Sequence, residues 1–175
     1  LIILMFDAAL VNFFPLYAET LLIGQAAIGT MFAIRALAST SVRLPTGVGS
    51  TRVPSRYLMT AALVLGMVMV WSICFLTSPL ALTIVLAGEG ICFGMFLTSG
   101  QTFVTEQVDE ADRGAAMGVY SMTGSIASTA GPFLMGAVAA LWGLRSVFWF
   151  TGALVFVGIL AFLYLSSRPG PAAQA

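Results

Sequence analysis

The stretch TEQVDEADRGAAMGVYSMTGSIASTAGPFLMGAVAA, residues 105–140, decides the fold because a short charged segment passes directly into a long apolar one. Four acids and Arg113 lie close together at its start, and no charged residue follows until Arg145. A helix needs about 20 apolar residues to cross a bilayer, and this uncharged stretch is long enough. The stretch therefore predicts a membrane boundary and a helix that begins near Arg113. The carboxylate of Asp112 is expected to accept hydrogen bonds from the first backbone N–H groups of that helix.

Small residues recur at spacings of three and four along this expected helix. In lipid, such residues let helix backbones approach closely, so that van der Waals contact and hydrogen bonds hold the helices together. Pro132 follows Gly131 past the middle of the stretch, and a proline inside a helix removes one backbone donor and favours a bend. We expect a closely packed helix with a candidate hinge at Gly131 and Pro132.

The motif RGAAMG at 113–118, followed by GPFLMG at 131–136, resembles the eleventh helix of the major facilitator superfamily of secondary transporters. Each glycine motif is weak by itself, since small residues spaced in this way occur in many membrane bundles. Their combination with an entering arginine is seldom seen elsewhere. The resemblance implies a gating or hinge role for Arg113, Gly131 and Pro132.

A second motif, GVGSTRVPSR at 47–56, is similar to the family's loop signature Gly-x3-Asp-Arg-x-Gly-Arg-Arg. Gly47, Arg52 and Arg56 stand on matching positions, and the resemblance implies a gating role for Gly47 and Arg52. Thr51 stands where the signature has its aspartate. Because this carboxylate is missing, any locking of the gate that depends on it is in doubt for this loop.

Composition excludes most other classes of protein. Hydrophobic residues make up 59% of the chain and charged residues 8%, the mean hydropathy is +1.02, and neither lysine nor histidine is present. This composition indicates a polytopic membrane protein. The missing residue types exclude Ser-His-Asp and Cys-His catalysis, Schiff-base chemistry and the phosphate-binding P-loop. Cys74 and Cys92 fall in apolar segments and are interpreted as core residues. We therefore expect no enzyme, no cofactor, no metal ion and no nucleic-acid partner.

The fold class is predicted as an all-α membrane protein, a six-helix transmembrane bundle that corresponds to the C-terminal half of the family's twelve-helix fold. The bundle is expected over residues 1–168, with the N-terminal half absent and a disordered tail at 169–175. The first crossing begins inside a helix and without methionine, which indicates a fragment. The expected crossings are about 1–18, 25–44, 57–77, 80–104, 113–140 and 146–166.

Arginine positions orient the bundle. With six crossings both chain ends share one side, which also receives the residues Arg43, Arg52, Arg56, Arg113 and Arg168. Only Arg145 falls on the opposite side. By the positive-inside rule the arginine-rich side is cytoplasmic. We expect a multi-pass protein of the plasma (inner) membrane with a cytoplasmic C-terminus.

Three charged residues lie within expected crossings, namely Asp7, Arg35 and Glu89 in the first, second and fourth. Ionisable groups at this depth are costly, and they usually face a pathway or a partner charge. In the family the matching helices border the central cavity. Arg35 has two interpretations. It either forms a structural ion pair, whose partner is Asp7, Glu89 or a residue outside this sequence, or it contacts the substrate. Glu89 is favoured for proton coupling, with Asp7 as its replacement should Glu89 prove dispensable.

Two further residues are candidates for the substrate pathway. Phe93 continues the helical face of Glu89 and offers an aromatic surface suited to an amphiphilic solute. Ser125 is one of several hydroxyl residues in the fifth crossing, although such groups more often bond to a neighbouring helix or to their own backbone.

The sequence favours transport of a small solute by alternating access, with the lipid bilayer, the N-terminal half, a small-molecule substrate and protons as partners. Efflux of a drug- or sugar-like substrate is preferred because FFPLYAE at 13–19 resembles the outer end of the seventh helix in the family's efflux branches. The alternative is a polytopic membrane sensor or assembly subunit that does not transport. A second six-span block upstream would support transport, and a soluble sensory domain would oppose it.

Overall fold

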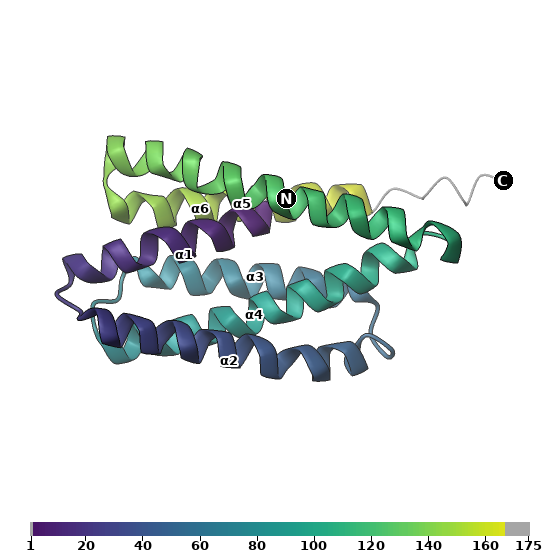
Figure 1. Ribbon diagram of the computed structural model, residues 1–175, viewed down its shortest axis with the longest axis horizontal. Helices are drawn as coiled ribbons and strands as arrows, with labels where there is room; N and C mark the ends of the chain where they lie inside the picture. The colour runs from purple at the N-terminus through teal and green to yellow at the C-terminus, as the bar shows by residue number, and fades with distance from the viewer. Residues whose placement is uncertain (1, 167–175) are drawn as a thin grey trace.

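Residues 2–166, which the computed structural model describes, form six α-helices and one short 3-10 turn, with no strand among them (Figure 1). The elements are α1 (Ile2–Thr20), α2 (Gln25–Gly49), α3 (Ser55–Ile73), α4 (Pro79–Glu106), η1 (Glu110–Asp112), α5 (Arg113–Trp142) and α6 (Leu144–Ser166). The prediction of an all-α protein is confirmed. The tail predicted at 169–175 lies outside the described residues.

Four stretches of the described chain are long and apolar enough to cross a bilayer. They are Ser55–Ile73, Pro79–Glu106, Glu110–Trp142 and Leu144–Tyr164, with mean hydropathies between 1.4 and 2.2. The helix α2 carries Arg35 and Arg43, which lower its hydropathy. The crossings expected at 1–18 and 25–44 remain predictions.

The boundary between α4 and α5 differs from the expectation in one detail. The helix α5 begins at Arg113, but the side chain of Asp112 makes no capping hydrogen bond. Asp112 ends the turn η1 with φ of −98° and ψ of −3°, whereas a capping residue normally has an extended backbone. Because the 3-10 turn leaves Asp112 without the extended backbone of a cap, the predicted cap is wrong.

The loop expected after residue 44 is shorter in the structure, because α2 continues through Pro45 to Gly49. The hydroxyl of Thr46 donates to the carbonyl of Val42 at 2.8 Å, and the N–H of Ser50 donates to the carbonyl of Thr46 at 2.9 Å. Such local bonds let a helix tolerate an internal proline. Only residues 50–54 connect α2 to α3, and the motif residue Gly47 lies within α2.

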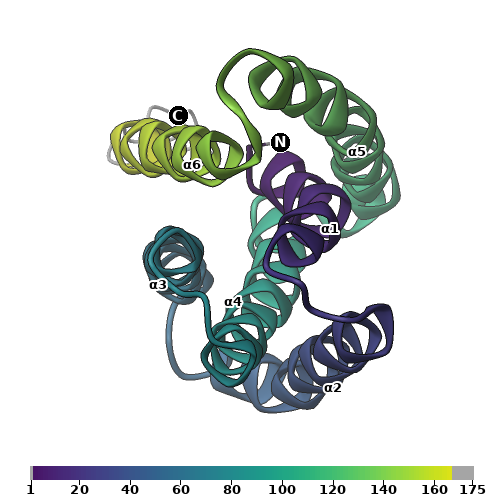
Figure 2. The ribbon, with the colours of Figure 1, turned by 90° about the vertical axis from the view of Figure 1, so that its left-hand side faces the viewer.

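The helices form two groups of three. Helices α2, α3 and α4 make the first group, in which α4 packs extensively against both α2 and α3, and α1, α5 and α6 make the second (Figure 1). Viewed from the end of the bundle, α3 and α6 lie on the left, α2 and α5 on the right, and α1 and α4 between them (Figure 2). The groups meet mainly where α3 contacts α6 and α4 contacts α5, while α1 and α2 share only a short contact.

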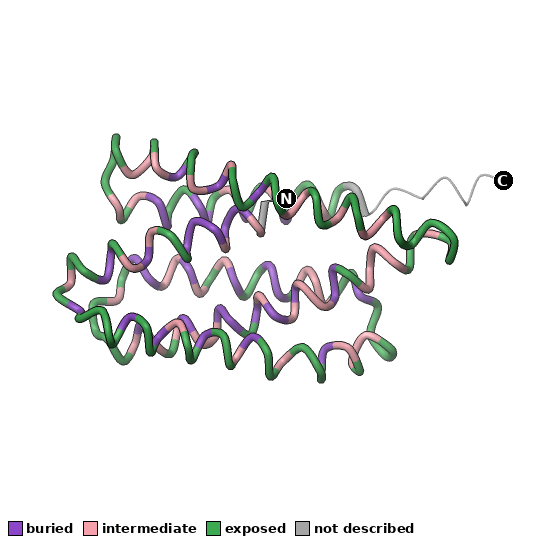
Figure 3. Tube along the Cα trace, in the orientation of Figure 1, coloured by how far each residue is buried: buried purple, intermediate pink, exposed green. Residues whose placement is uncertain are grey.

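Apolar side chains between the helices make the core, and buried stretches lie on the inward sides of the helices (Figure 3). Phe14 of α1, Val70 of α3, Leu86 of α4 and Phe148 of α6 belong to one buried cluster that joins the two groups. Large apolar side chains are also exposed, among them Phe133 at 86%. Exposed apolar surface on long hydrophobic helices suits a lipid environment.

Glycines set the closest helix contacts, as the small-residue spacing predicts. A Cβ atom placed at Gly90 or Gly94 of α4 would overlap the carbonyl oxygens of Arg35 and Ser39 in α2. A Cβ atom at Gly131 of α5 would lie 2.8 Å from the carbonyl oxygen of Met5 in α1, closer than such atoms approach in real proteins. The helix pairs α2–α4 and α1–α5 therefore depend on the absence of a side chain at these positions.

We predict that Gly131→Leu separates α1 from α5, because any side chain at this position meets backbone that cannot move aside. Overpacking costs about 1–3 kcal/mol or more, so the melting temperature of the detergent-purified full-length protein should fall. Membrane insertion should persist. Gly118→Leu is the matched control, since a Cβ atom at Gly118 of the same helix meets nothing within 4 Å. Equal melting temperatures for the two variants would show that Gly131 does not hold the α1–α5 contact.

Candidate functional site

Arg35 occupies the centre of the candidate site, although it belongs to a helix of mostly apolar and small residues. Only 8% of the residue is exposed. Its backbone carbonyl lies against Gly90 of α4, and this close approach carries the side chain into the space between α2, α4 and α1. A guanidinium in such surroundings loses its hydration and requires partner charges.

Glu89 of α4 is the first partner. Nε of Arg35 donates to Oε2 of Glu89, and Nη2 donates to Oε1 at 3.1 Å. Both carboxylate oxygens are thus used, in the forked geometry that makes arginine–carboxylate pairs strong and directional. The Glu89 residue has no exposed surface. It is among the largest fully buried side chains of the protein.

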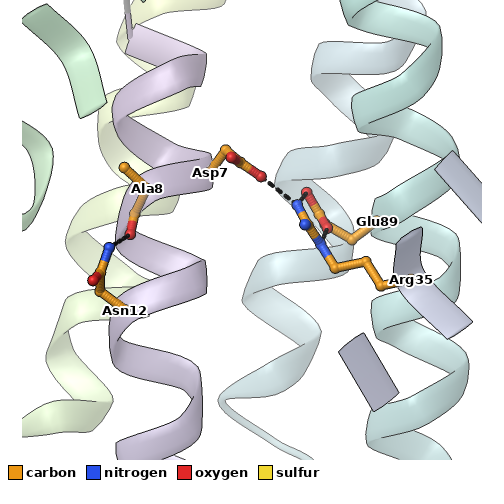
Figure 4. Close-up of polar contacts among 5 residues, drawn as sticks. All are labelled: Asp7, Ala8, Asn12, Arg35 and Glu89. Carbon is orange, nitrogen blue, oxygen red and sulfur yellow. Dashed lines mark hydrogen bonds and ion pairs between the residues drawn. The ribbon is translucent and has the colours of Figure 1, made fainter. Parts of the chain in front are cut away.

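Asp7 of α1 is the second partner. Nη2 of Arg35 also donates to Oδ1 of Asp7, and the Asp7 side chain is 23% exposed. Figure 4 shows Asp7, Arg35 and Glu89 directed toward one another from three helices, while Asn12 lies on the opposite side of α1. The amide of Asn12 donates to the carbonyl of Ala8 at 2.6 Å and takes no part in the cluster.

The three residues Asp7, Arg35 and Glu89, hereafter the ion cluster, have unequal charges. Two ionised carboxylates and one guanidinium leave one negative charge in excess. The other arginines of the described chain are exposed, so none of them balances this charge. The ion cluster is therefore suited to bind one further positive charge.

Phe93 lies beside the ion cluster. Its ring centroid is 5.3 Å from Cζ of Arg35, within the range of a cation–π contact. Phe93 follows Glu89 by one turn of α4, which matches the shared helical face expected from the sequence. The structure thus places four of the predicted residues together, namely Asp7, Arg35, Glu89 and Phe93.

Ser125 lies elsewhere. It is exposed on α5, and its hydroxyl donates to the carbonyl of Ser121 at 3.2 Å. Ser125 lines an open groove of about 670 Å³ whose walls come from α5 alone, including Ile126, Thr129 and Phe133. The structure does not bring this groove and the ion cluster into one site.

The predicted gating residues also lie apart from the ion cluster. Arg113 is exposed at the start of α5, and Arg52 is exposed in the turn after α2. Gly47 faces α4, where Thr98 Cγ2 lies 3.9 Å from the position of a Cβ atom. Gly131 is buried against α1 and is followed by Pro132 within the continuous helix α5. Their gating roles remain predictions.

Sequence reasoning missed one polar contact between the groups. Arg145, which the sequence placed on the side opposite the other loop arginines, is exposed, and its Nη2 donates to the carbonyl of Cys74, which follows α3. Basic side chains often bond to the last carbonyls of a helix. The residue type of Arg145 therefore suggested such a bond, but the sequence did not indicate which helix would accept it. The bond ties the start of α6 to the end of α3.

Comparison with known proteins agrees with this architecture. The sequence model of the Major Facilitator Superfamily matches residues 1–175. The chain is 30% identical over 165 residues to the multidrug resistance protein MdtG of Serratia proteamaculans, covering 91% of this chain and 40% of that protein. An uncharacterised MFS-type transporter of Methanocaldococcus jannaschii is 29% identical over 147 residues, covering 83% of this chain and 37% of that protein.

A shorter match involves a multi-drug resistance efflux pump, PmrA, of Streptococcus pneumoniae. It is 33% identical over 84 residues, which are 47% of this chain and 21% of the pump. The chain spans about two fifths of the length of the relatives that it matches over most of its residues.

We predict that Arg35→Met destabilises the protein because it leaves the buried Glu89 and the half-buried Asp7 without their cation. Breaking a buried ion pair costs about 3–5 kcal/mol. The double variant Arg35→Met, Glu89→Met should recover part of that loss, since it removes the most deeply buried charge as well. Thermal unfolding of the full-length protein in detergent measures both. Arg43→Met, an exposed position on the same helix, is the control, and an equal effect of Arg35→Met and Arg43→Met would contradict the buried pairing.

Proposed function

The chain belongs to the Major Facilitator Superfamily, and on that premise we propose that it is one half of a secondary transporter that moves a small solute by alternating access. In such transporters the substrate binds near the midplane between two similar halves. The six helices of this chain would form one wall of that site. The absent half would complete it.

The observation that carries the proposal is the ion cluster, which lies within the bundle rather than at its ends. Intramembrane ionisable residues that pair with one another mark substrate pathways and proton relays in transporters. The excess negative charge suits the binding of a proton. A carboxyl that is protonated in one conformation and ionised in the other would link proton movement to the rocking of the two halves.

Efflux is the proposed direction of transport. Two of the relatives are a multidrug resistance protein and a multi-drug resistance efflux pump. Phe93 beside the ion cluster offers an aromatic surface to an amphiphilic, drug-like or sugar-like solute. This surface and the relatives together support a drug-like or sugar-like substrate.

A protein that does not transport, such as a membrane sensor or assembly subunit, is the competing proposal. In such a protein the ion cluster would serve only to hold the helices together. The transport experiment below separates the two, since a purely structural cluster would give no dependence on a proton gradient.

The proposed orientation places 43–56, 105–113 and 167–175 on the cytoplasmic side, with 19–25 and 142–146 opposite. Single cysteines at 50 and 144, in a background with Cys74 and Cys92 replaced, should be labelled by an impermeant reagent from opposite sides. Labelling of both positions from the same side would contradict the orientation. We expect the inner (plasma) membrane as the location.

We predict that everted membrane vesicles containing the full-length protein accumulate lipophilic drugs or sugars and that a proton-gradient uncoupler abolishes the accumulation. Arg35→Gln should reduce it by at least about tenfold, because the ion cluster loses the cation that both carboxylates share. Arg43→Gln should transport as the parent does. Accumulation that is insensitive to the uncoupler would reject proton coupling, and the absence of transport over the whole screen would favour the sensor or assembly role.

A further inference from the structure

We propose that the exposed face of α3 binds one anionic phospholipid, with the headgroup on Arg52 and Arg56 and an acyl chain along the helix. The inference goes beyond the proposed function, because it concerns a surface that takes no part in the ion cluster. It does not depend on the substrate or on the direction of transport.

The turn that joins α2 to α3 presents two arginines without an acidic partner. Arg52 lies in the turn, Arg56 is the second residue of α3, and both are exposed. Both salt bridges among the described residues involve Arg35 instead. Because Arg52 and Arg56 are four positions apart in the chain, their Cα atoms are separated by at most about 14 Å. Two long basic side chains at this spacing can reach one phosphate group together.

The acids at the same end of the bundle do not pair with these arginines. Glu106 at the end of α4 accepts a hydrogen bond from Ser55, which is buried on the inner side of α3. The other acids of this end belong to the connection between α4 and α5, and they form no salt bridge with any described residue. No acid occurs in the chain between Glu19 and Glu89. The start of α3 is therefore locally basic.

Tyr57 holds the side chain of Arg56 in place. Nη2 of Arg56 donates to the hydroxyl of Tyr57 at 3.0 Å, and Cζ of Arg56 lies 4.7 Å from the centroid of the Tyr57 ring. This contact uses one of the five N–H donors of the guanidinium and leaves the others for a ligand. Tyrosine is enriched at the membrane interface, at the level of the lipid headgroups. Arg56 is thus preorganised at the depth where a phosphate group lies.

An apolar stripe along α3 begins at this pair. Five residues at helical spacing share the exposed side of α3, namely Tyr57, Ala61, Val64, Leu65 and Val68. The four larger side chains are between 40% and 56% exposed. The stripe is about 16 Å long, since a helix rises about 1.5 Å per residue. This length matches one leaflet of a hydrocarbon core about 30 Å thick, so one acyl chain can lie along the stripe.

The position of α3 in the bundle favours lipid as the occupant of this face. The inner side of α3 packs against α4 and α6, and the helix lies on the left of the bundle in Figure 2. The helix α2, which carries Arg35 of the ion cluster, lies on the right. A second half that completes a site at the ion cluster would approach α1, α2 and α4. The exposed face of α3 would then remain in contact with the bilayer.

The first test measures lipid binding to the detergent-purified full-length protein by native mass spectrometry. Phosphatidylglycerol and phosphatidylcholine with the same acyl chains are added in a concentration series, and the parent should bind one phosphatidylglycerol more tightly. The double variant Arg52→Gln, Arg56→Gln should weaken its binding by at least about tenfold, because each basic residue near a lipid surface contributes about fivefold. Arg113→Gln, an exposed arginine that follows the acids of the same end, should bind as the parent does.

The second test locates the lipid in vesicles. A phosphatidylglycerol with a diazirine in its acyl chain is photoactivated, and peptide mass spectrometry should find its adducts on residues 57–68. These adducts should exceed those from phosphatidylcholine with the same labelled chain. The excess should disappear in the double variant and persist in Arg113→Gln. Equal labelling of residues 57–68 by the two lipids in the parent would overturn the proposal.

Other occupants of the two arginines give different results, and each of these results would also overturn the proposal. A site for a free anion would release phosphatidylglycerol on addition of inorganic phosphate but not of potassium chloride at equal ionic strength. Pairing with an acidic segment of the absent half would lower the melting temperature of the lipid-free double variant. The preference of that variant for phosphatidylglycerol would then equal that of the parent.

Discussion

The rest of the structure depends on the burial of one guanidinium. Arg35 is almost enclosed, and it satisfies its charge with carboxylates from two other helices. The cost of removing three charged groups from water nearly cancels their attraction, so such a cluster adds little to overall stability. The cluster instead fixes how the helices are placed, because Asp7 and Glu89 reach Arg35 together in only one relative placement of α1, α2 and α4.

Steric contact holds α2 and α4 closely together, whereas α1 has only a short contact with α2. Gly90 and Gly94 let α4 touch the backbone of α2, and Gly131 lets α5 touch the backbone of α1. These contacts join α2 to α4 in one group and α1 to α5 in the other. The ion pair that crosses between the groups, Asp7 to Arg35, lies where α1 and α2 have little other contact.

The sequence predicted the all-α fold class because long runs of apolar residues along the chain indicate membrane helices. It left the partner of Arg35 open, because spacing gives the position of a residue along a helix but not the way neighbouring helices are turned toward one another. The same limit hid the bond from Arg145 to the Cys74 carbonyl. The cap expected from Asp112 failed for a local reason, since the turn η1 replaces the extended backbone that a cap requires.

The ends of the bundle are held in a different way from its middle. In the loop motif at 47–56, Thr51 stands where the family's signature has an aspartate. Ser55 of the same motif donates a hydrogen bond to Oε1 of Glu106 at 3.1 Å, and this bond joins the start of α3 to the end of α4. Both salt bridges that the described residues form involve Arg35. Ser55 is buried, and its hydroxyl bond to the Glu106 carboxylate involves one charged group, whereas each bond within the ion cluster joins two charged groups.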